Sequence, residues 1–201
     1  QVELRGKFIH ANQKDLPHLI WLPDLIDTAE SFEKFFTRSD SKVLNVRNVH
    51  LLNYRNFGSS DHHESFDMSD ITADIIRYMD KNHITMATIG GHGFGAKVAT
   101  ATATDNLDRF TGVMWLDGGP VDNRYHPAYT LLKCYINKLG KYDISQMTKQ
   151  DVQKKIDFYI VDADWNRIFK ENINTDKGYP QWNFNFAGLQ ANMSKHAPDV
   201  A

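Results

Sequence analysis

The segment from Thr88 to Ala99 constrains the fold of this chain more than any other part of it. An apolar run from Ile84 to Ile89 enters the segment, glycines crowd its centre, and an alanine- and threonine-rich stretch leaves it. The apolar run predicts a strand, and the glycines allow a turn too sharp for larger side chains. The stretch after the turn has helical potential. We therefore expect a strand, a sharp turn and a helix in direct succession.

Composition excludes several classes of protein. A chain of 201 residues that is 41% hydrophobic is long enough to fold as one domain around a buried core. Its 23 basic and 25 acidic residues nearly cancel, so we expect no nucleic-acid partner. Apolar runs stay far below the roughly 20 residues that span a bilayer, so we expect no transmembrane segment. The single cysteine, Cys134, has no internal disulfide partner, and we expect it to be packed and not reactive.

Strands and helices alternate along the first 122 residues. We expect strands over residues 2–9, 16–22, 43–54, 84–89 and 111–116, and helices over 29–37 and from an N-cap at Asp67 to about Asn82. Such alternation predicts a parallel sheet with helices on both faces. Further on we expect helices over 129–139 and 149–160 and no further strand. The sequence thus predicts a core over residues 1–122 and a helical lid or insertion over 123–201.

Several short motifs follow one another in a fixed order along the chain. They are Arg55-Asn56-Phe57-Gly58-Ser59-Ser60, Asp67-Met68-Ser69, Gly91-His92-Gly93-Phe94-Gly95-Ala96-Lys97, Asp117-Gly118-Gly119-Pro120-Val121 and Trp182-Asn183-Phe184-Asn185-Phe186-Ala187-Gly188-Leu189. Together they resemble the α/β-hydrolases, in particular the small bacterial and mitochondrial esterases of the alpha/beta-hydrolase domain-containing protein 11 type. The resemblance implies a three-layer α/β sandwich with a parallel sheet and a helical lid insertion.

The resemblance also implies which residues form the nucleophile elbow, the sharp turn on which these enzymes carry their serine. The elbow would consist of Gly91, His92, Gly93, Phe94 and Gly95. The serine of the family falls on Gly93, which has no hydroxyl group to attack a substrate. We interpret His92 as part of the turn and not as a substitute nucleophile.

Other parts of the implied active site also depart from the family. The oxyanion loop falls on Pro23 to Thr28, where Asp24 and Asp27 bring negative charge to a place in which backbone donors must hold an anion. The acid of the triad is retained at Asp117. The family's histidine follows two further strands, and because the sequence ends at Ala201 we expect those strands and that histidine to be missing.

Two other kinds of site are disfavoured. His62 and His63 lie beside Asp61 and Glu64 in a polar loop, but without the spacing that makes metal ligands converge, so we expect no metal site. The glycines of the central turn do not follow the G-x-G-x-x-G pattern of nucleotide loops, so we expect no nucleotide cofactor.

These departures lead to a functional prediction. The sequence predicts a catalytically inactive α/β-hydrolase homologue, not an enzyme, that acts as an accessory or structural subunit among the other protein subunits of a large complex. Because the resembled esterases are bacterial or mitochondrial, we expect a mitochondrial location, in an inner-membrane complex of the respiratory chain or the ATP synthase. The candidate interface residues are the aromatic side chains Tyr179, Trp182, Phe184 and Phe186. The alternative is a residual esterase- or thioesterase-like enzyme, or a binder of small apolar ligands in a pocket between sheet and lid.

Overall fold

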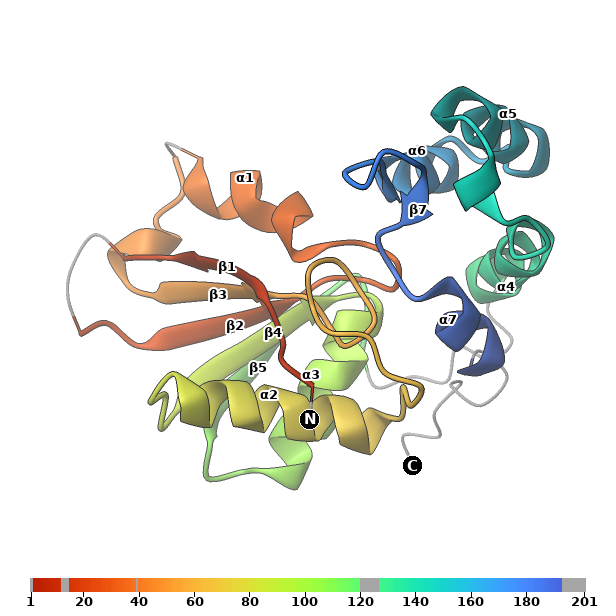
Figure 1. Cartoon of the computed structure of the whole chain (residues 1–201). Coiled ribbons are helices and arrows are strands. Elements are labelled where there is room, and N and C mark those ends of the chain that lie inside the picture. Colours follow the sequence, from red (N-terminus) through yellow and green to blue (C-terminus); the bar gives the residue numbers. More distant parts are fainter. Residues whose placement is uncertain (1, 12–14, 39, 120–126, 193–201) are drawn as a thin grey trace. The chain divides into compact units, whose positions relative to one another are not determined.

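A computed structural model describes residues 2–11, 15–38, 40–119 and 127–192. The chain forms two compact units, which divide between Val121 and Asp122 (Figure 1). We refer to them as the first unit and the second unit. The first unit contains the sheet and the glycine turn, and the second is largely helical.

The first unit is built on a five-stranded sheet. Its strands are β1 (Gly6–Ile9), β2 (His18–Leu22), β3 (Asn48–Leu52), β4 (Ala87–His92) and β5 (Phe110–Leu116), in the spatial order β1-β3-β2-β4-β5. Strands β2 to β5 run parallel, whereas β1 pairs with β3 in the antiparallel direction. The sheet is therefore mostly parallel, as expected, with an antiparallel edge strand of a kind that is common in α/β folds.

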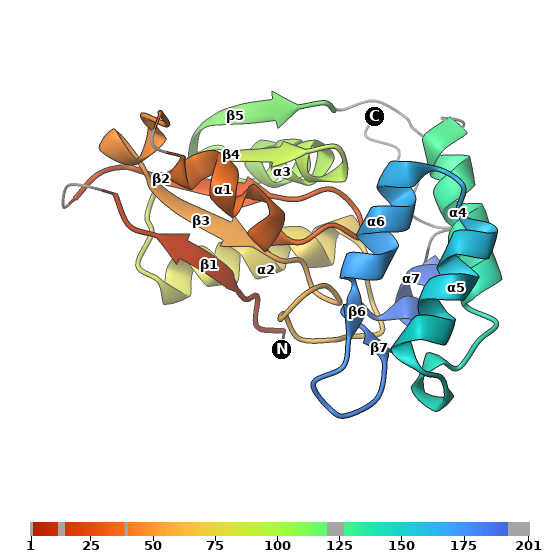
Figure 2. The same cartoon turned by 90° about the horizontal axis from the view of Figure 1, so that it is seen from above.

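Helices cover both faces of this sheet. Helix α1 (Glu33–Thr37), preceded by a 3-10 turn (Ala29–Phe32), lies on one face, and α2 (Met68–Lys81) and α3 (Phe94–Asp105) lie on the other (Figures 1 and 2). The face under α1 buries a cluster of apolar side chains: Leu19, Trp21, Ala29, Phe36, Val49 and Leu51. The predicted three-layer α/β-hydrolase-type arrangement is confirmed.

One local expectation in the first unit is corrected, and a second is met in position only. The strand expected over residues 43–54 is shorter, because the carbonyl of Val43 accepts hydrogen bonds from the amides of Val46 and Arg47 and closes a 3-10 turn ahead of β3. Asp67 stands at the N-cap position of α2, as expected, but its side chain makes no capping hydrogen bond. The residue types at the start of the expected strand favour a strand, so the sequence did not reveal the 3-10 turn ahead of β3.

The second unit consists of four helices and a short hairpin in the part of the chain that the structure describes. The helices are α4 (Pro127–Leu139), α5 (Lys149–Tyr159), α6 (Ala163–Glu171) and α7 (Phe186–Asn192), with a 3-10 turn at Ile144–Gln146. Strands β6 (Ile173–Asn174) and β7 (Gln181–Trp182) pair in the antiparallel direction. The expectation of no further strand is therefore wrong.

Two more features of the second unit differ from expectation. Helix α6 was not expected, and it begins where the Asp162 carboxylate accepts hydrogen bonds from the amides of Asp164 and Trp165. Cys134 is exposed on α4, so the expectation that it is packed is wrong. Among the described residues, no helix combines the length and the apolar character needed to cross a membrane.

Candidate active site at the glycine turn

The expected strand, turn and helix meet at Gly93. This residue follows β4 directly, precedes the first residue of α3, and has φ 54° and ψ −113°. Such angles are strained for any residue with a Cβ atom. The Gly93 amide donates a 3.0 Å hydrogen bond to the carbonyl of Leu116 at the end of β5. The backbone thus has the sharp strand-to-helix turn of a nucleophile elbow.

Close packing explains the two glycines that flank this turn. A Cβ atom on Gly91 would lie 2.3 Å from the carbonyl carbon of Gly95. A Cβ atom on Gly95 would lie 2.4 Å from the carbonyl oxygen of Leu22, the last residue of β2. Both distances are far below van der Waals contact, so the start of α3 can approach the end of β2 only with glycine at these positions.

The carboxyl group of Asp24 binds two backbone amides at the turn. Its Oδ1 atom accepts hydrogen bonds from the amides of Leu25 and Phe94, each 2.7 Å long. In α/β-hydrolases the oxyanion hole consists of the amide of the residue after the nucleophile and an amide from a loop after an early strand. Phe94 and Leu25 occupy these two places here. Asp24 therefore supplies the oxygen atom that the amide pair holds in this structure.

The same carboxyl group also fills the space beside Gly93. A Cβ atom on Gly93 would lie 2.4 Å from Cγ of Asp24 and 2.5 Å from each of its two carboxyl oxygens. The Cβ atom of a serine at this position would therefore overlap the Asp24 carboxyl group. The structure thus brings Asp24 and Gly93, two candidate residues that are far apart in the sequence, into direct contact.

Burial and hydrogen bonding act on the Asp24 carboxyl in opposite directions. Burial raises the pKa of Asp24 above its ordinary value, because an ionised carboxylate loses hydration. The amides of Phe94 and Leu25 and the nearby His92 oppose this shift, whereas Asp27 adds to it. Burial is the largest effect, so Asp24 binds a proton more readily than an exposed aspartate does.

His92 and Asp117 lie beside the turn, but they are only loosely paired. His92 Nε2 is 3.8 Å from Asp117 Oδ2, and the Asp117 side chain is 92% exposed. The Nδ1 atom of His92 is buried and has no hydrogen-bond partner within the described residues. Asp117 has a positive φ of 47°, which is unusual for a residue other than glycine. No described histidine stands between this acid and a nucleophile in the arrangement of a catalytic triad.

Two residues that follow β3 support the Asp24 loop, and the sequence analysis did not identify either of them. The Tyr54 hydroxyl donates a 2.7 Å hydrogen bond to the carbonyl of Pro23, and Asn53 Oδ1 accepts a 2.8 Å hydrogen bond from the amide of Ala29. Both side chains are fully buried. Their place directly after a strand could have signalled this role, because the carboxyl ends of parallel strands meet at one edge of the sheet.

The four candidate interface residues lie in the second unit, and their side chains differ in solvent exposure. Tyr179 is exposed, Trp182 and Phe186 are half-buried, and Phe184 is only 2% exposed. The Phe184 ring packs against Phe169, Trp182 and Phe186, with centroids 6.4, 5.6 and 5.4 Å away. Phe184 is therefore part of the core of the second unit, and the expectation that it is an exposed interface anchor is corrected.

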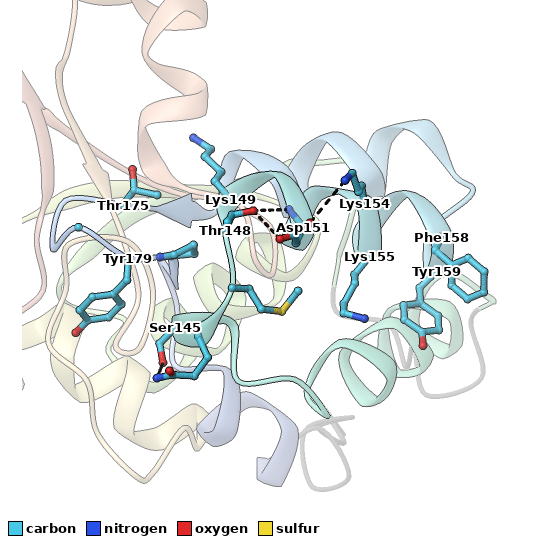
Figure 3. A pocket seen from close by; sticks show the side chains of 14 residues that line it. Ser145, Thr148, Lys149, Asp151, Lys154, Lys155, Phe158, Tyr159, Thr175 and Tyr179 are labelled. Carbon is cyan, nitrogen blue, oxygen red and sulfur yellow. Dashed lines mark hydrogen bonds and ion pairs between the residues drawn. The ribbon is translucent and has the colours of Figure 1, made fainter.

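The second unit also contains an open hollow of about 1100 Å³. Figure 3 shows that its lining includes Lys149, Lys154 and Lys155 from α5 and Tyr179 from the loop between β6 and β7. The only described acid in this lining, Asp151, accepts a hydrogen bond from Thr148 and pairs with Lys154. The hollow thus has a mixed polar and apolar wall, and its described acid is not held by a pair of backbone amides as Asp24 is.

Within the described ranges, no three histidine, cysteine or acidic side chains come together in a way that could hold a metal ion. The candidate site at the glycine turn is defined by the backbone amides of Leu25 and Phe94 and the carboxyl group of Asp24.

Comparisons with known proteins point to esterases and related enzymes. No protein-family model matches this chain. Ethanol acetyltransferase 1 of Kluyveromyces marxianus is 24% identical over 130 residues, which are 62% of this chain and 36% of that protein. The sn-1-specific diacylglycerol lipase ABHD11 of Xenopus tropicalis is 22% identical over 187 residues, which are 92% of this chain and 56% of that protein. The chain thus spans about a third to just over half of these relatives.

A solved structure described as a marine microorganism esterase superposes with a TM-score of 0.84 at 20% identity, over 96% of this chain and 72% of that one. These matched proteins are named as enzymes, which points to enzymatic activity, so the prediction that the chain is not an enzyme is wrong. The glycine turn, the layered sheet and these likenesses together identify the chain as an α/β-hydrolase-fold protein that resembles ABHD11.

Proposed function

We propose that this chain is an esterase-type enzyme that hydrolyses acyl esters or thioesters at the turn around Gly93. One observation carries the proposal: the amides of Leu25 and Phe94 both point at a single oxygen atom, 2.7 Å away. This is the distance at which an oxyanion hole holds the oxygen of a tetrahedral intermediate. The two donors are thus already oriented for a carbonyl oxygen on which negative charge develops.

The group that these amides hold has the shape of an acyl group. A carboxyl group is a planar carbon with two oxygens, as is the ester carbonyl of a substrate or the acid that forms from it. Asp24 Oδ1 therefore stands where the carbonyl oxygen of an ester would bind. The names of the matched proteins, an acetyltransferase, a lipase and an esterase, also describe chemistry at acyl groups.

The attacking group in this proposal is water. Gly93 stands at the position of the serine and has no side chain, so no acyl-enzyme can form there. Hydrolysis then takes place in one addition and one elimination at the acyl carbon. The mitochondrial location and the protein partners expected from the sequence stay predictions, since the names of these matched proteins give neither a compartment nor a complex.

The test is hydrolysis of p-nitrophenyl acetate, butyrate and octanoate, and of butyrylthiocholine, by the purified chain. The informative variant is Phe94→Pro, because proline is well tolerated at the first position of a helix and removes only the amide donor from the backbone. Phe94→Ala is the matched control, since it also loses the ring but keeps the amide. We expect Phe94→Pro to lose about 10²- to 10³-fold in kcat relative to Phe94→Ala.

Two results would overturn the proposal. One is a wild-type rate that equals the rate in buffer for all four substrates. The other is an equal rate for Phe94→Pro and Phe94→Ala, both folded by circular dichroism.

A further inference from the structure

We propose that Asp24 is the catalytic base of this site and activates the water that attacks the acyl carbon, a role that rests on the proposed function. No other described carboxyl group lies within hydrogen-bond distance of both candidate oxyanion amides. The Asp24 carboxyl group extends to the glycine turn from the loop after β2, whereas a serine at position 93 would extend there from the end of β4.

In the site without substrate, one oxygen of this carboxyl group is held by backbone amides and the other is not. Oδ1 accepts the two amide hydrogen bonds, and within the described residues Oδ2 accepts none. Asp24 and the neighbouring residues of the turn, His92, Gly93 and Phe94, each keep some exposed surface, so water can reach the edge of the group, although the surrounding atoms are dense enough for burial to raise the pKa of Asp24. Gly93 leaves room for the carboxyl group, because any Cβ atom there would overlap with it.

Binding of an ester would strengthen this base. The ester carbonyl and Oδ1 need the same two amides, so a bound ester displaces the carboxyl group from them. Those two hydrogen bonds lower the pKa of Asp24, whereas its burial raises it. When the two amides bind the substrate oxygen instead, they no longer lower the pKa of Asp24. Burial then raises this pKa without their opposition, and the carboxylate takes a proton from water more readily.

The reaction is balanced without any further reagent. The oxygen of water bonds to the acyl carbon while a proton of that water passes to the Asp24 carboxylate. The electrons of the carbonyl double bond move to the oxygen that the Leu25 and Phe94 amides hold. When the double bond forms again, the bond to the leaving alkoxide or thiolate breaks, and that group takes the proton from Asp24. The products are an acid and an alcohol or thiol, and Asp24 is again ionised.

The charged and titratable groups around Asp24 are few. His92 lowers its pKa from the end of β4, and Asp27 raises it from the same loop. Tyr54 faces the loop from the end of β3, with a pKa well above its ordinary value because of burial first and the negative charges of Asp24 and Asp27 second. Tyr54 thus stays protonated as a hydrogen-bond donor to Pro23 and does not compete as a base.

Asp27 provides a matched control. Its Oδ1 accepts a 2.7 Å hydrogen bond from the amide of Thr28, and its Oδ2 accepts one of 3.0 Å from the Ser31 hydroxyl. It is therefore an aspartate of the same loop, also bound to the next amide, but both of its oxygens are engaged away from Gly93. Asp27→Asn should keep the kcat of the wild type when both are measured at a pH well above the pKa of Asp24.

The decisive variant is Asp24→Asn. Asparagine has the same shape, and its Oδ1 can accept both amide hydrogen bonds, so the turn should keep its structure. Because an amide cannot take a proton from water, we expect kcat to fall by about 10²- to 10⁴-fold. In the wild type, kcat/KM should rise with pH through a pKa above the ordinary aspartate range. This rise of kcat/KM with pH should be absent in Asp24→Asn and should occur at lower pH in Asp27→Asn.

Three results would overturn the role of Asp24 while leaving the proposed function intact. A wild-type rate in Asp24→Asn would mean that the carboxyl group has no part in the reaction. A higher rate in Asp24→Asn would mean that it only blocks the amides. Single turnover in ¹⁸O-labelled water should label only the product acid, and label in Asp24 would make this residue a nucleophile instead of a base. A wild-type chain without esterase activity would overturn the proposed function, and this role with it.

Discussion

The carboxyl group of Asp24 and a side chain at residue 93 would occupy the same volume. The ideal Cβ position of residue 93 is only 2.4 Å from Cγ of Asp24, and the same carboxyl group accepts the amide of residue 94. The loss of the serine and the acidic residue in the oxyanion loop are thus not two separate departures from the family pattern. They are linked in space, because the Asp24 side chain from the β2 loop fills the volume that a side chain at the β4 turn would take.

We predict that Gly93→Ser alone destabilises the chain and gives no esterase gain. The new Cβ atom would overlap the Asp24 carboxyl group, and φ of 54° is strained for any residue with a Cβ atom, at about 1–3 kcal/mol. Urea unfolding should show part of this loss recovered in the double variant Asp24→Gly, Gly93→Ser, because only the overlap is relieved. Equal stabilities of the single and double variants would contradict the overlap.

We predict that Asp24→Asn makes the chain more stable at neutral pH. Because the pKa of Asp24 is raised by burial, the folded state holds this proton more tightly than the unfolded state does. The stabilising contribution is complete below the unfolded pKa, near 3.9, and is lost as the pH rises through the folded pKa. The difference in unfolding free energy between Asp24→Asn and the wild type should therefore grow from pH 4 upward and then level off. A difference that does not change with pH would refute this prediction.

We predict that low pH destabilises the first unit, because the buried His50 on β3 binds a proton more readily in the unfolded chain. This buried ring on β3 bonds to His18 Nδ1 at 2.8 Å and to the Tyr78 hydroxyl at 2.9 Å. Burial lowers the pKa of His50 to about 3, with smaller effects of His18 and His10, and burial also lowers the pKa of His18. The unfolded state thus binds more protons between about pH 6.5 and 3, and stability falls as the pH decreases through that window.

The measurement is the unfolding free energy at several pH values between 7 and 4. His50 alone should contribute a slope of up to about 1.4 kcal/mol per pH unit. His50→Gln should remove that part of the slope. His83→Gln, at an exposed position two residues after α2, controls for the exchange of histidine for glutamine as such. A wild-type slope that persists in His50→Gln would show that other groups cause the acid sensitivity.

We predict that Asp74→Asn destabilises the first unit strongly. Asp74 Oδ2 lies 2.6 Å from Nε of Arg55, the two side chains are 0% and 4% exposed, and Arg77 also pairs with Asp74. The buried Arg55 then keeps only its ion pair with the more exposed Asp70, 3.2 Å away, so the loss should approach the cost of a fully unpaired buried charge, about 3–5 kcal/mol, without reaching it. Asp40→Ala breaks the exposed pair with Arg38 and should change stability by less than about 1 kcal/mol. Similar losses in the two variants would contradict this account.

The sequence predicted the architecture because its signals are local. The apolar run before Gly90 and the small residues after it require a strand, a turn and a helix, whichever residues pack around them. The second unit was predicted less well, because β6 and β7 have two residues each and depend on their pairing. Phe184 likewise looked like a surface anchor because its burial depends on Phe169 and Trp182, which only the folded chain brings together.

The candidate site was predicted in part, for a similar reason. Gly93 and Asp24 were each recognised as departures from a family pattern, because each occupies a motif position. Their overlap could not be foreseen, because 69 residues separate them and the distance depends on how β2 and β4 pair. The support from Tyr54 and Asn53 was missed for the same reason, since neither belongs to a motif with known chemistry.

The shared volume at residues 24 and 93 also restricts how such a site can evolve. A serine at position 93 costs stability while the Asp24 carboxyl group keeps its present position, and an acidic residue at position 24 meets the same cost beside a serine. A lineage that moves between the two states avoids this cost by passing through a form in which both positions are small. Among natural relatives, a serine at position 93 and an acidic residue at position 24 should therefore exclude each other, so that either residue predicts the other.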